Sequence, residues 1–184
     1  MLIWILGVGC SMLMGSKSET VDSSEISDSS SPEEGTDTDN INNGETDRMI
    51  GMTEAHNVIR RTYGVPDLIW DTELVTVSEE WIVHLAQTGC NLEHNWDSPL
   101  GENLFWSNYQ ETYGGVVDSW ASEVEYYDYA SNSCATNQMC GHFTQLVWST
   151  TERVGCAVGA CADGSEIWMC NYDPPGNYSG VWPY

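Results

Sequence analysis

The stretch Gly-His-Phe-Thr-Gln-Leu-Val-Trp, residues 141–148, is short and largely apolar, and it begins next to a histidine, His142. Its length is compatible with either a helix or a buried strand. Two runs of strand-forming residues follow it, 154–160 and 166–172, and Asp163-Gly164 separates them. Because Asp-Gly between two such runs is typical of a hairpin turn, the sequence predicts an antiparallel pair of strands here.

Three segments upstream of this stretch have the spacing of helices that bury one face. Thr53 is expected to cap a first helix, which would end at Gly64. A second helix is expected from Asp71 to Gly89, because its apolar residues recur every three or four positions. A third is expected over residues 116–127. Helices combined with a small antiparallel sheet indicate an α+β fold built in layers.

The first 48 residues have two compositions, and neither suits a packed domain. Residues 1–15 are almost wholly apolar or small. That run is shorter than the roughly 20 residues of a membrane-spanning helix, and it suits the core of a secretory signal peptide. Residues 16–48 are rich in Ser, Asp, Glu and Thr and hold few large apolar side chains, so we expect a disordered acidic linker. The folded domain is expected over residues 49–184.

The charge of the chain restricts its partners. Acidic side chains number 28 against 5 basic ones, which makes the formal net charge -23. A nucleic-acid partner is not expected, because binding a polyanion requires a surface rich in lysine and arginine. An acidic surface attracts cations or basic partners instead.

Seven cysteines favour an exported protein, because disulfides persist outside the reducing cytosol. Six of them lie in the expected domain: Cys90, Cys134, Cys140, Cys156, Cys161 and Cys170. Their order leaves the pairing open, although Cys134 and Cys140 are close enough to suggest a local loop. A zinc–thiolate cluster is the alternative, and the absence of a C-x2-C pair disfavours it.

The seventh cysteine, Cys10, lies within the expected signal. Small residues precede it, as they precede the lipidated cysteine of a bacterial lipobox, although Gly7 stands where a large aliphatic residue is usual. Two outcomes stay open. Lipidation at Cys10 would anchor the chain at the cell surface, and an ordinary signal peptide would be removed together with this residue.

Four residues of the domain have the chemistry of metal ligands: His94, Glu102, Glu123 and His142. Imidazole and carboxylate are the usual ligands of zinc and similar ions, but these four lie far apart in the sequence and form a site only if the fold brings them together. His56 and His84 are expected to be packed or surface histidines. The sequence has no H-E-x-x-H, G-x-S-x-G, P-loop or dinucleotide glycine motif.

Two motifs resemble the signatures of a known family. Residues 141–148 closely resemble the first signature of the CAP superfamily (SCP/TAPS), which includes cysteine-rich secretory proteins, antigen 5 and pathogenesis-related 1 proteins. Residues 170–178, Cys-Asn-Tyr-Asp-Pro-Pro-Gly-Asn-Tyr, resemble the second. Shorter matches occur at His56-Asn57, 64–71, 101–104, and Trp120 with Glu123. The chain is similar to single-domain members, such as plant pathogenesis-related 1 and microbial SCP-domain proteins.

The resemblance implies a three-layer α-β-α sandwich with a large central cleft. The family's cleft tetrad, in which the histidines can hold zinc or another divalent ion, falls on His94, Glu102, Glu123 and His142. Glu125 would point to a different face of the helix and is the less favoured member. Transferred by order, the family's disulfides would join Cys90 with Cys161, Cys134 with Cys140, and Cys156 with Cys170.

The function that the resemblance implies is that of an extracellular binding module and not an enzyme. Such a module would take a small lipid, a sterol or a fatty acid, together with a divalent metal, and serve in defence or host interaction. Contact with a membrane is expected only through a lipid anchor at Cys10. The alternative is an extracellular hydrolase, a protease above all, in which the tetrad activates water. A third reading is an interaction domain whose cleft binds neither metal nor lipid.

Overall fold

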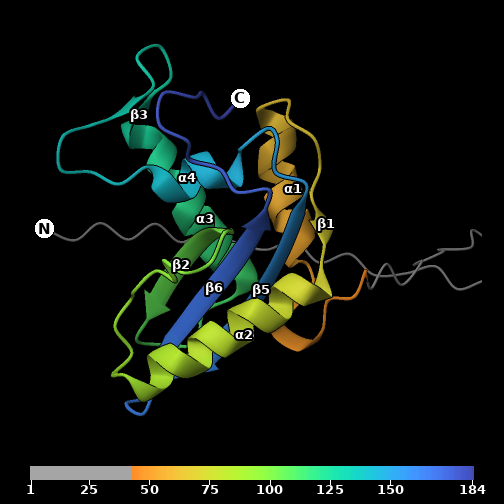
Figure 1. The fold of residues 1–184 in the computed structure, drawn as a ribbon, viewed down its shortest axis with the longest axis vertical. Coiled ribbons are helices and arrows are strands. Elements are labelled where there is room, and N and C mark those ends of the chain that lie inside the picture. The colour runs from red at the N-terminus through yellow and green to blue at the C-terminus, as the bar shows by residue number, and fades with distance from the viewer. Residues whose placement is uncertain (1–42) are drawn as a thin grey trace, which may run out of the picture. The chain divides into compact units, whose positions relative to one another are not determined.

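The computed structural model describes residues 43–184, and Figure 1 shows how their helices and strands are arranged. The expected signal over residues 1–15, with Cys10, and residues 16–42 of the expected linker lie outside the described residues. Among the helices of the described part, none combines the length and the apolar character that crossing a membrane requires.

A four-stranded sheet with the order β1-β5-β6-β2 forms the middle of the domain. Its centre is the hairpin of β5 (Arg153–Ala160) and β6 (Glu166–Asp173), which confirms the pair expected around Asp163-Gly164. Strand β2 (Gly101–Ser107) runs antiparallel to β6. Strand β1 (Ile69–Trp70) is parallel to β5, so the sheet is antiparallel except at this two-residue edge.

Helices cover both faces of this sheet, as Figure 1 shows. Helix α2 (Thr72–Gln87) packs along β5 and β6 on one face. Helices α1 (Met52–Thr62), α3 (Tyr113–Ser122) and α4 (Gly141–Leu146) pack together on the other face. The expected three-layer α-β-α sandwich is therefore confirmed. Most of the stretch 141–148, which the sequence left open between helix and strand, forms helix α4. A separate two-stranded sheet joins β3 (Tyr127–Asp128) to β4 (Ser133–Cys134).

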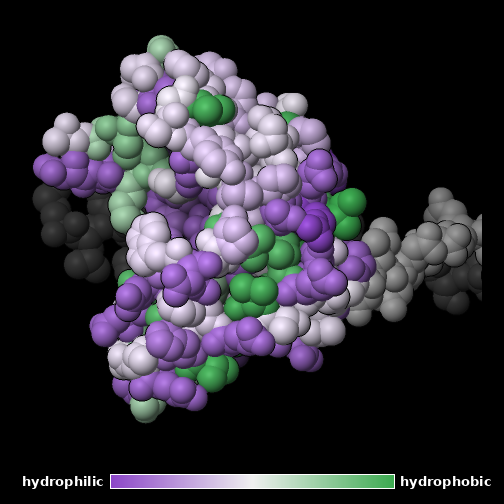
Figure 2. All heavy atoms as spheres, viewed as in Figure 1, coloured by the Kyte–Doolittle hydropathy of each residue, from purple (hydrophilic) through white to green (hydrophobic). Residues whose placement is uncertain are grey.

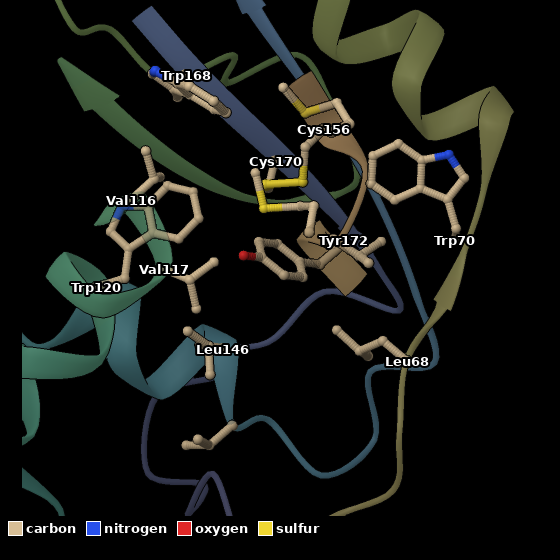
Figure 3. Close-up of a cluster of buried hydrophobic side chains, with 14 of the residues drawn as sticks. Leu68, Trp70, Val116, Val117, Trp120, Leu146, Cys156, Trp168, Cys170 and Tyr172 are labelled. Atoms are coloured by element: carbon tan, nitrogen blue, oxygen red, sulfur yellow. A yellow bond between two sulfur atoms is a disulfide. The ribbon is translucent and has the colours of Figure 1, made fainter. Parts of the chain in front are cut away.

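Each face of the sheet has its own cluster of buried side chains. Trp168 and Cys170 of β6 face α1, α3 and α4, where Trp120 and Tyr172 join them (Figure 3). Ile167 and Met169 alternate with them along the strand and face α2 on the other side. Because both of its faces are covered, β6 reads as a nearly continuous apolar run.

The start of helix α1 differs from the sequence expectation. Residue Gly51, and not Thr53, is the N-cap. The buried carboxylate of Glu45 accepts hydrogen bonds from the backbone N–H of Gly51 at 2.8 Å and of Thr53 at 2.6 Å, and from the Thr53 hydroxyl at 2.5 Å. Residues 43–48, which the composition assigned to the disordered linker, are therefore part of the folded domain.

The third helix is also shorter than expected. Helix α3 begins after Thr112, whose hydroxyl accepts from the backbone N–H of Gly115, and the chain then tightens into a 3-10 turn, η2 (Glu123–Tyr126). The helix therefore ends before residue 127, and the Glu123 carboxylate accepts hydrogen bonds from the backbone of α4. The second helix begins as expected, with the Asp71 carboxylate accepting from the N–H groups of Glu73 and Leu74.

Three disulfides cross-link the domain: Cys90–Cys161, Cys134–Cys140 and Cys156–Cys170. These are the pairs that the family resemblance implies. The bond between Cys156 and Cys170 joins the central strands β5 and β6 inside the core (Figure 3). With all six domain cysteines in disulfides, the zinc–thiolate alternative is excluded.

Candidate functional site

The first of two histidine–glutamate pairs joins the loop after α2 to strand β2. Atom Nδ1 of His94 lies 2.5 Å from Oε1 of Glu102, and the other oxygen of Glu102 accepts from the backbone N–H of Asn95 at 3.3 Å. The Glu102 side chain is only 8% exposed, whereas that of His94 is 43% exposed. The buried carboxylate thus fixes an imidazole whose other nitrogen, Nε2, has no hydrogen-bond partner within residues 43–184.

The second pair joins the end of α3 to the start of α4. Atom Nδ1 of His142 lies 2.6 Å from Oε1 of Glu123. The other Glu123 oxygen accepts from the backbone N–H groups of His142 at 3.0 Å and Phe143 at 3.1 Å. A carboxylate in this place satisfies N–H groups that a helix leaves unpaired at its start. Glu125 is exposed and takes no part in this pair, as the sequence expectation held.

Strand β2 connects the two pairs. Its residue Glu102 belongs to the first pair, and the next residue, Asn103, donates from Nδ2 to the carbonyl oxygen of His142 at 3.1 Å. The same amide nitrogen lies 3.2 Å from the hydroxyl of Tyr172, which in turn lies 2.9 Å from Nε2 of His56. His56 is thus a packed core histidine. It is connected to the backbone of His142 through the buried side chains of Tyr172 and Asn103.

The environments of two histidines shift their pKa values in opposite directions. The hydrogen bond with Glu102 raises the pKa of His94 above its ordinary value, and partial burial opposes this effect. Burial lowers the pKa of His56 to about 4. At neutral pH the supporting imidazole is therefore uncharged, whereas the imidazole at the surface is the one that more readily holds a proton.

The two histidines offer their Nε2 atoms, and not Nδ1, as candidate metal ligands. Within residues 43–184, no three side chains of His, Cys, Asp or Glu converge closely enough to hold an ion as a group. Each imidazole is instead engaged at Nδ1 by a carboxylate, which leaves Nε2 as the ligand atom. Metal-binding histidines are usually oriented by such a carboxylate at the other ring nitrogen, so each pair has the chemistry of one imidazole ligand with its supporting carboxylate.

A cavity of about 420 Å³ adjoins the first pair, with His94 and Glu102 in its lining. Trp96 also lines it; this side chain is 83% exposed and meets the His94 ring edge-on with centroids 5.5 Å apart. The opposite wall contains Gln145 of α4, whose buried amide oxygen accepts from the backbone N–H of Gly176 at 2.9 Å. The two sequence motifs therefore meet at this cavity.

Three residues of the site were not predicted from the sequence as site residues: Trp96, Asn103 and Gln145. Each carried a signal, since Trp96 follows His94 by two positions, Asn103 follows Glu102, and Gln145 lies in the first motif. Gly101 has a structural role as well. A Cβ atom at this position would lie 2.3 Å from the amide oxygen of Gln145, so only glycine lets α4 approach β2 this closely.

Comparisons with known proteins identify the family of this chain. Residues 53–172 match the family model described as the cysteine-rich secretory protein family, CAP. Pathogenesis-related protein PR-1 of Medicago truncatula is 43% identical over 130 residues, which cover 70% of this chain and 74% of the relative. Pathogenesis-related protein 1A of Nicotiana tabacum is 44% identical over 132 residues, 71% of this chain and 77% of the relative.

Solved structures share the fold at lower identity. Venom allergen-like protein 4 of Schistosoma mansoni superposes with a TM-score of 0.61 at 24% identity, over 76% of this chain and 95% of the other. The crystal structure of NaASP2 with Zn2+ gives a TM-score of 0.62 at 21% identity, over 78% of this chain and 88% of the other. On the sequence match and the shared fold together, this chain belongs to the CAP superfamily, and plant pathogenesis-related 1 proteins are among its relatives.

Proposed function

We propose that this protein is an exported binding module whose cleft holds a divalent metal ion, zinc above all, through His94 and His142, and takes a small lipid beside it. The observation that carries the proposal is the pairing of each histidine with its own carboxylate, Glu102 or Glu123. Each pair presents one free imidazole nitrogen, and the bound ion would supply Lewis acidity toward a ligand's oxygen.

The surroundings of the two pairs favour a cation. A chain with a formal net charge of -23 concentrates cations near its surface, especially at low ionic strength. Two imidazoles backed by carboxylates then offer nitrogen ligands of the kind that zinc accepts. The structure of NaASP2, which shares the fold, was solved with Zn2+, and zinc is therefore the first ion to test here.

A small amphipathic lipid, a sterol or a fatty acid, suits the mixed lining of the cavity of about 420 Å³. Trp96, Leu100 and Pro175 supply apolar surface, and His94 and Gln145 supply polar groups on the same walls. Small-molecule pockets combine apolar walls with a few polar groups that orient the ligand. The exposed indole of Trp96 is the side chain best placed to pack on an apolar ligand that enters from solvent.

Export and a defence role complete the proposal. Three disulfides in one small domain are typical of proteins that work outside the cytosol. The relatives from Medicago truncatula and Nicotiana tabacum are named pathogenesis-related proteins, which supports a role in defence or host interaction. Lipidation at Cys10 would hold the domain at the cell surface, and removal of the signal would release it.

Calorimetric titration of metal-free protein with zinc tests the metal site. His94→Ala and His142→Ala should each lower zinc affinity by more than 10-fold, and Glu102→Gln by about 10- to 100-fold because it disturbs only the orientation of a ligand. His84→Ala is the matched control, since His84 is exposed on α2 and stacks on Trp81. Unchanged affinity in both histidine variants would refute the site.

Binding of a labelled sterol and a labelled fatty acid tests the lipid half separately. Saturable binding that weakens in Trp96→Ala would support the cleft as the lipid site. Trp106→Ala is a suitable control, because Trp106 is likewise exposed, at 44%, and lies outside the residues that line this cavity. Absence of saturable binding of either lipid would remove this half of the proposal and leave the metal site intact.

A further inference from the structure

A second and larger cavity, of about 620 Å³, lies along one side of strand β5 and shares no lining residue with the cavity beside His94. Three segments and one residue of β6, Glu166, line it: residues 44–49 at the start of the domain, residues 70–79 at β1 and the first turns of α2, and residues 156–160 of β5. Because its walls are separate from the histidine pairs, this cavity has no part in the function proposed above.

The cavity exists because β5 is only partly covered at its edge. Strand β6 pairs with β5 from Arg153 to Ala160, but β1 pairs with it only at Arg153 and Val154 (Figure 1). The last hydrogen bond to this edge runs from the backbone N–H of Asp71 to the carbonyl oxygen of Val154. Beyond that point α2 and residues 44–49 flank the strand in place of a neighbouring strand, and the space between them is the cavity.

The lining of this cavity combines apolar and polar side chains. Trp70, Val75 and Val158 supply apolar side chains from β1, α2 and β5, and Met49 adds another from the initial segment, whereas Thr46, Thr72 and Thr76 are polar. Figure 2 shows hydrophobic residues as separate green areas among hydrophilic purple ones on the face that bears α2. A partly enclosed space of this size with apolar side chains on three of its segments suits the body of a small amphipathic molecule.

One polar group in the wall has no partner. The side chain of Trp70 is buried, with 7% of the residue exposed, and its Nε1 makes no hydrogen bond with the rest of residues 43–184. Figure 3 shows this nitrogen on the side of the indole away from Cys156 and the core disulfide. An indole N–H can only donate, and a buried donor without an acceptor is unfavourable.

Gly44 stands beside this indole nitrogen and also lines the cavity. A Cβ atom built on Gly44 would lie 3.2 Å from Cδ1 and 3.8 Å from Nε1 of Trp70. With glycine there, no side chain of residue 44 covers the edge of the indole. Gly44 is therefore the backbone segment of the lining that lies next to the unpaired indole nitrogen.

The charges around the cavity select against an anionic ligand. The guanidinium of Arg48 is already engaged by both carboxylate oxygens of Glu166, at 2.7 and 2.8 Å, and donates to the Glu111 carbonyl oxygen at 2.7 Å. The other charged residues of the lining, Asp47 and Glu79, are acidic and exposed. A carboxylate or phosphate head would meet their like charge, whereas a hydroxyl or carbonyl oxygen would not.

We propose that this cavity binds a neutral amphipathic molecule, which places an apolar body against Val75 and Val158 and offers a hydroxyl or carbonyl oxygen to the indole N–H of Trp70. The site is distinct from the metal cleft. Its ligand class follows from three features together: the apolar side chains of the lining, the single unpaired donor, and the acidic residues at the opening.

Titration with 1-octanol, followed by the indole N–H signals in proton–nitrogen NMR spectra, tests the proposal directly. The Trp70 signal, assigned by its absence in Trp70→Phe, should move in a saturable way as it gains an acceptor. Octanoate at pH 8, with the same chain and an ionised head, should bind at least 10-fold more weakly. In Trp70→Phe the affinity for 1-octanol should fall by about 2- to 10-fold, the effect of one hydrogen bond.

Controls separate this site from the cleft and from damage to the fold. Trp81→Phe should bind 1-octanol normally, because the Trp81 indole donates to the Glu93 carbonyl oxygen outside the cavity. Val75→Trp keeps Trp70 and fills the space from the partly exposed face of α2, so it should abolish binding. His94→Ala should lose zinc and still bind 1-octanol.

Three results would overturn the proposal. The first is a Trp70 signal that does not respond to 1-octanol in the wild type. The second is equal affinity for octanoate and 1-octanol. The third is binding that survives Val75→Trp but disappears in His94→Ala, since this would place the ligand in the metal cleft. None of the three affects the zinc titration, so the proposed function stands or falls separately.

Discussion

Acid should destabilise this protein through one buried histidine, His56. Its ring is fully buried, with Nδ1 at 2.8 Å from the Met52 carbonyl oxygen and Nε2 at 2.9 Å from the Tyr172 hydroxyl. The carbonyl can only accept, so Nδ1 carries the proton and Nε2 accepts from the tyrosine. Protonation would remove this acceptor and place a second cation near the buried Arg60, and burial lowers the pKa of His56 to about 4.

The sign and the size of the effect follow from this pKa. Between pH 6.5 and 4 the unfolded chain binds a proton at His56 and the folded chain does not, so the free energy of unfolding falls as the pH falls. The slope is about half of 1.4 kcal/mol per pH unit at pH 6.5 and approaches the full value below it, so the loss amounts to about 1.6 kcal/mol between pH 6.5 and 5. Glu166 and Asp71, whose pKa values are lowered in the fold, add their losses at more acidic pH.

His94 acts in the opposite direction. Its pKa is raised in the folded state, so its contribution to stability is present below pH about 6.5 and is lost as the pH rises through the folded pKa. The ring is 43% exposed, and solvent screening keeps this contribution small. The net loss on acidification from pH 6.5 to 5 is therefore assigned to His56.

Urea unfolding of metal-free protein, followed by tryptophan fluorescence at pH 7, 6 and 5, measures this loss. The wild type should lose about 1.8 kcal/mol between pH 7 and 5. His56→Gln should be less stable at pH 7 but nearly independent of pH in this window, and His84→Gln should keep the wild-type slope. Parallel profiles for wild type and His56→Gln would refute the reasoning. If His56→Gln does not fold, NMR titration of the wild-type imidazole decides, because a His56 signal that titrates near pH 6.5 contradicts a lowered pKa.

Three further predictions concern groups that hold the layers together. Arg60→Lys should lower the free energy of unfolding by about 3 kcal/mol. The buried guanidinium donates to four backbone carbonyl oxygens, and an ammonium cannot reach them all. An unchanged midpoint of urea unfolding would contradict this. Glu45→Ala should cost about 1–2 kcal/mol in the same assay, because three donors at the start of α1 lose their acceptor, whereas the exposed Glu54→Ala should cost far less. Gly101→Ala should cost about 1–3 kcal/mol and displace Gln145, which a shift of the Gly176 backbone amide signal would report; an unshifted signal would show that α4 has room to move.

Some parts of the fold could be predicted from the sequence, because they depend on residues that are neighbours in the chain. Asp163-Gly164 indicated the hairpin of β5 and β6, and the apolar spacing after Asp71 indicated α2, since turns and amphipathic helices are local patterns. The end of α3 could not be predicted from such local patterns. A 3-10 turn follows the helix from Glu123. The carboxylate of this residue accepts hydrogen bonds from the backbone of α4, which begins at Gly141.

The candidate site shows the same division. The residue types of His94, Glu102, Glu123 and His142 indicated ligand chemistry, and the family resemblance selected them as a set. The sequence did not show that they form two pairs, nor that Asn103 links them. That arrangement depends on β2 and α4 packing side by side.

By itself, therefore, the sequence determined the layered α+β class, the central hairpin, the membership of the family and the chemistry available to the domain. Each of these follows from local patterns or from motifs. The tertiary structure alone decided that Glu45 belongs to the fold, that each histidine has its own carboxylate, and that the indole N–H of Trp70 has no partner within residues 43–184. The physical reason is that hydrogen bonding and burial at these positions depend on segments far apart in the chain, whose approach is set by packing of the whole core.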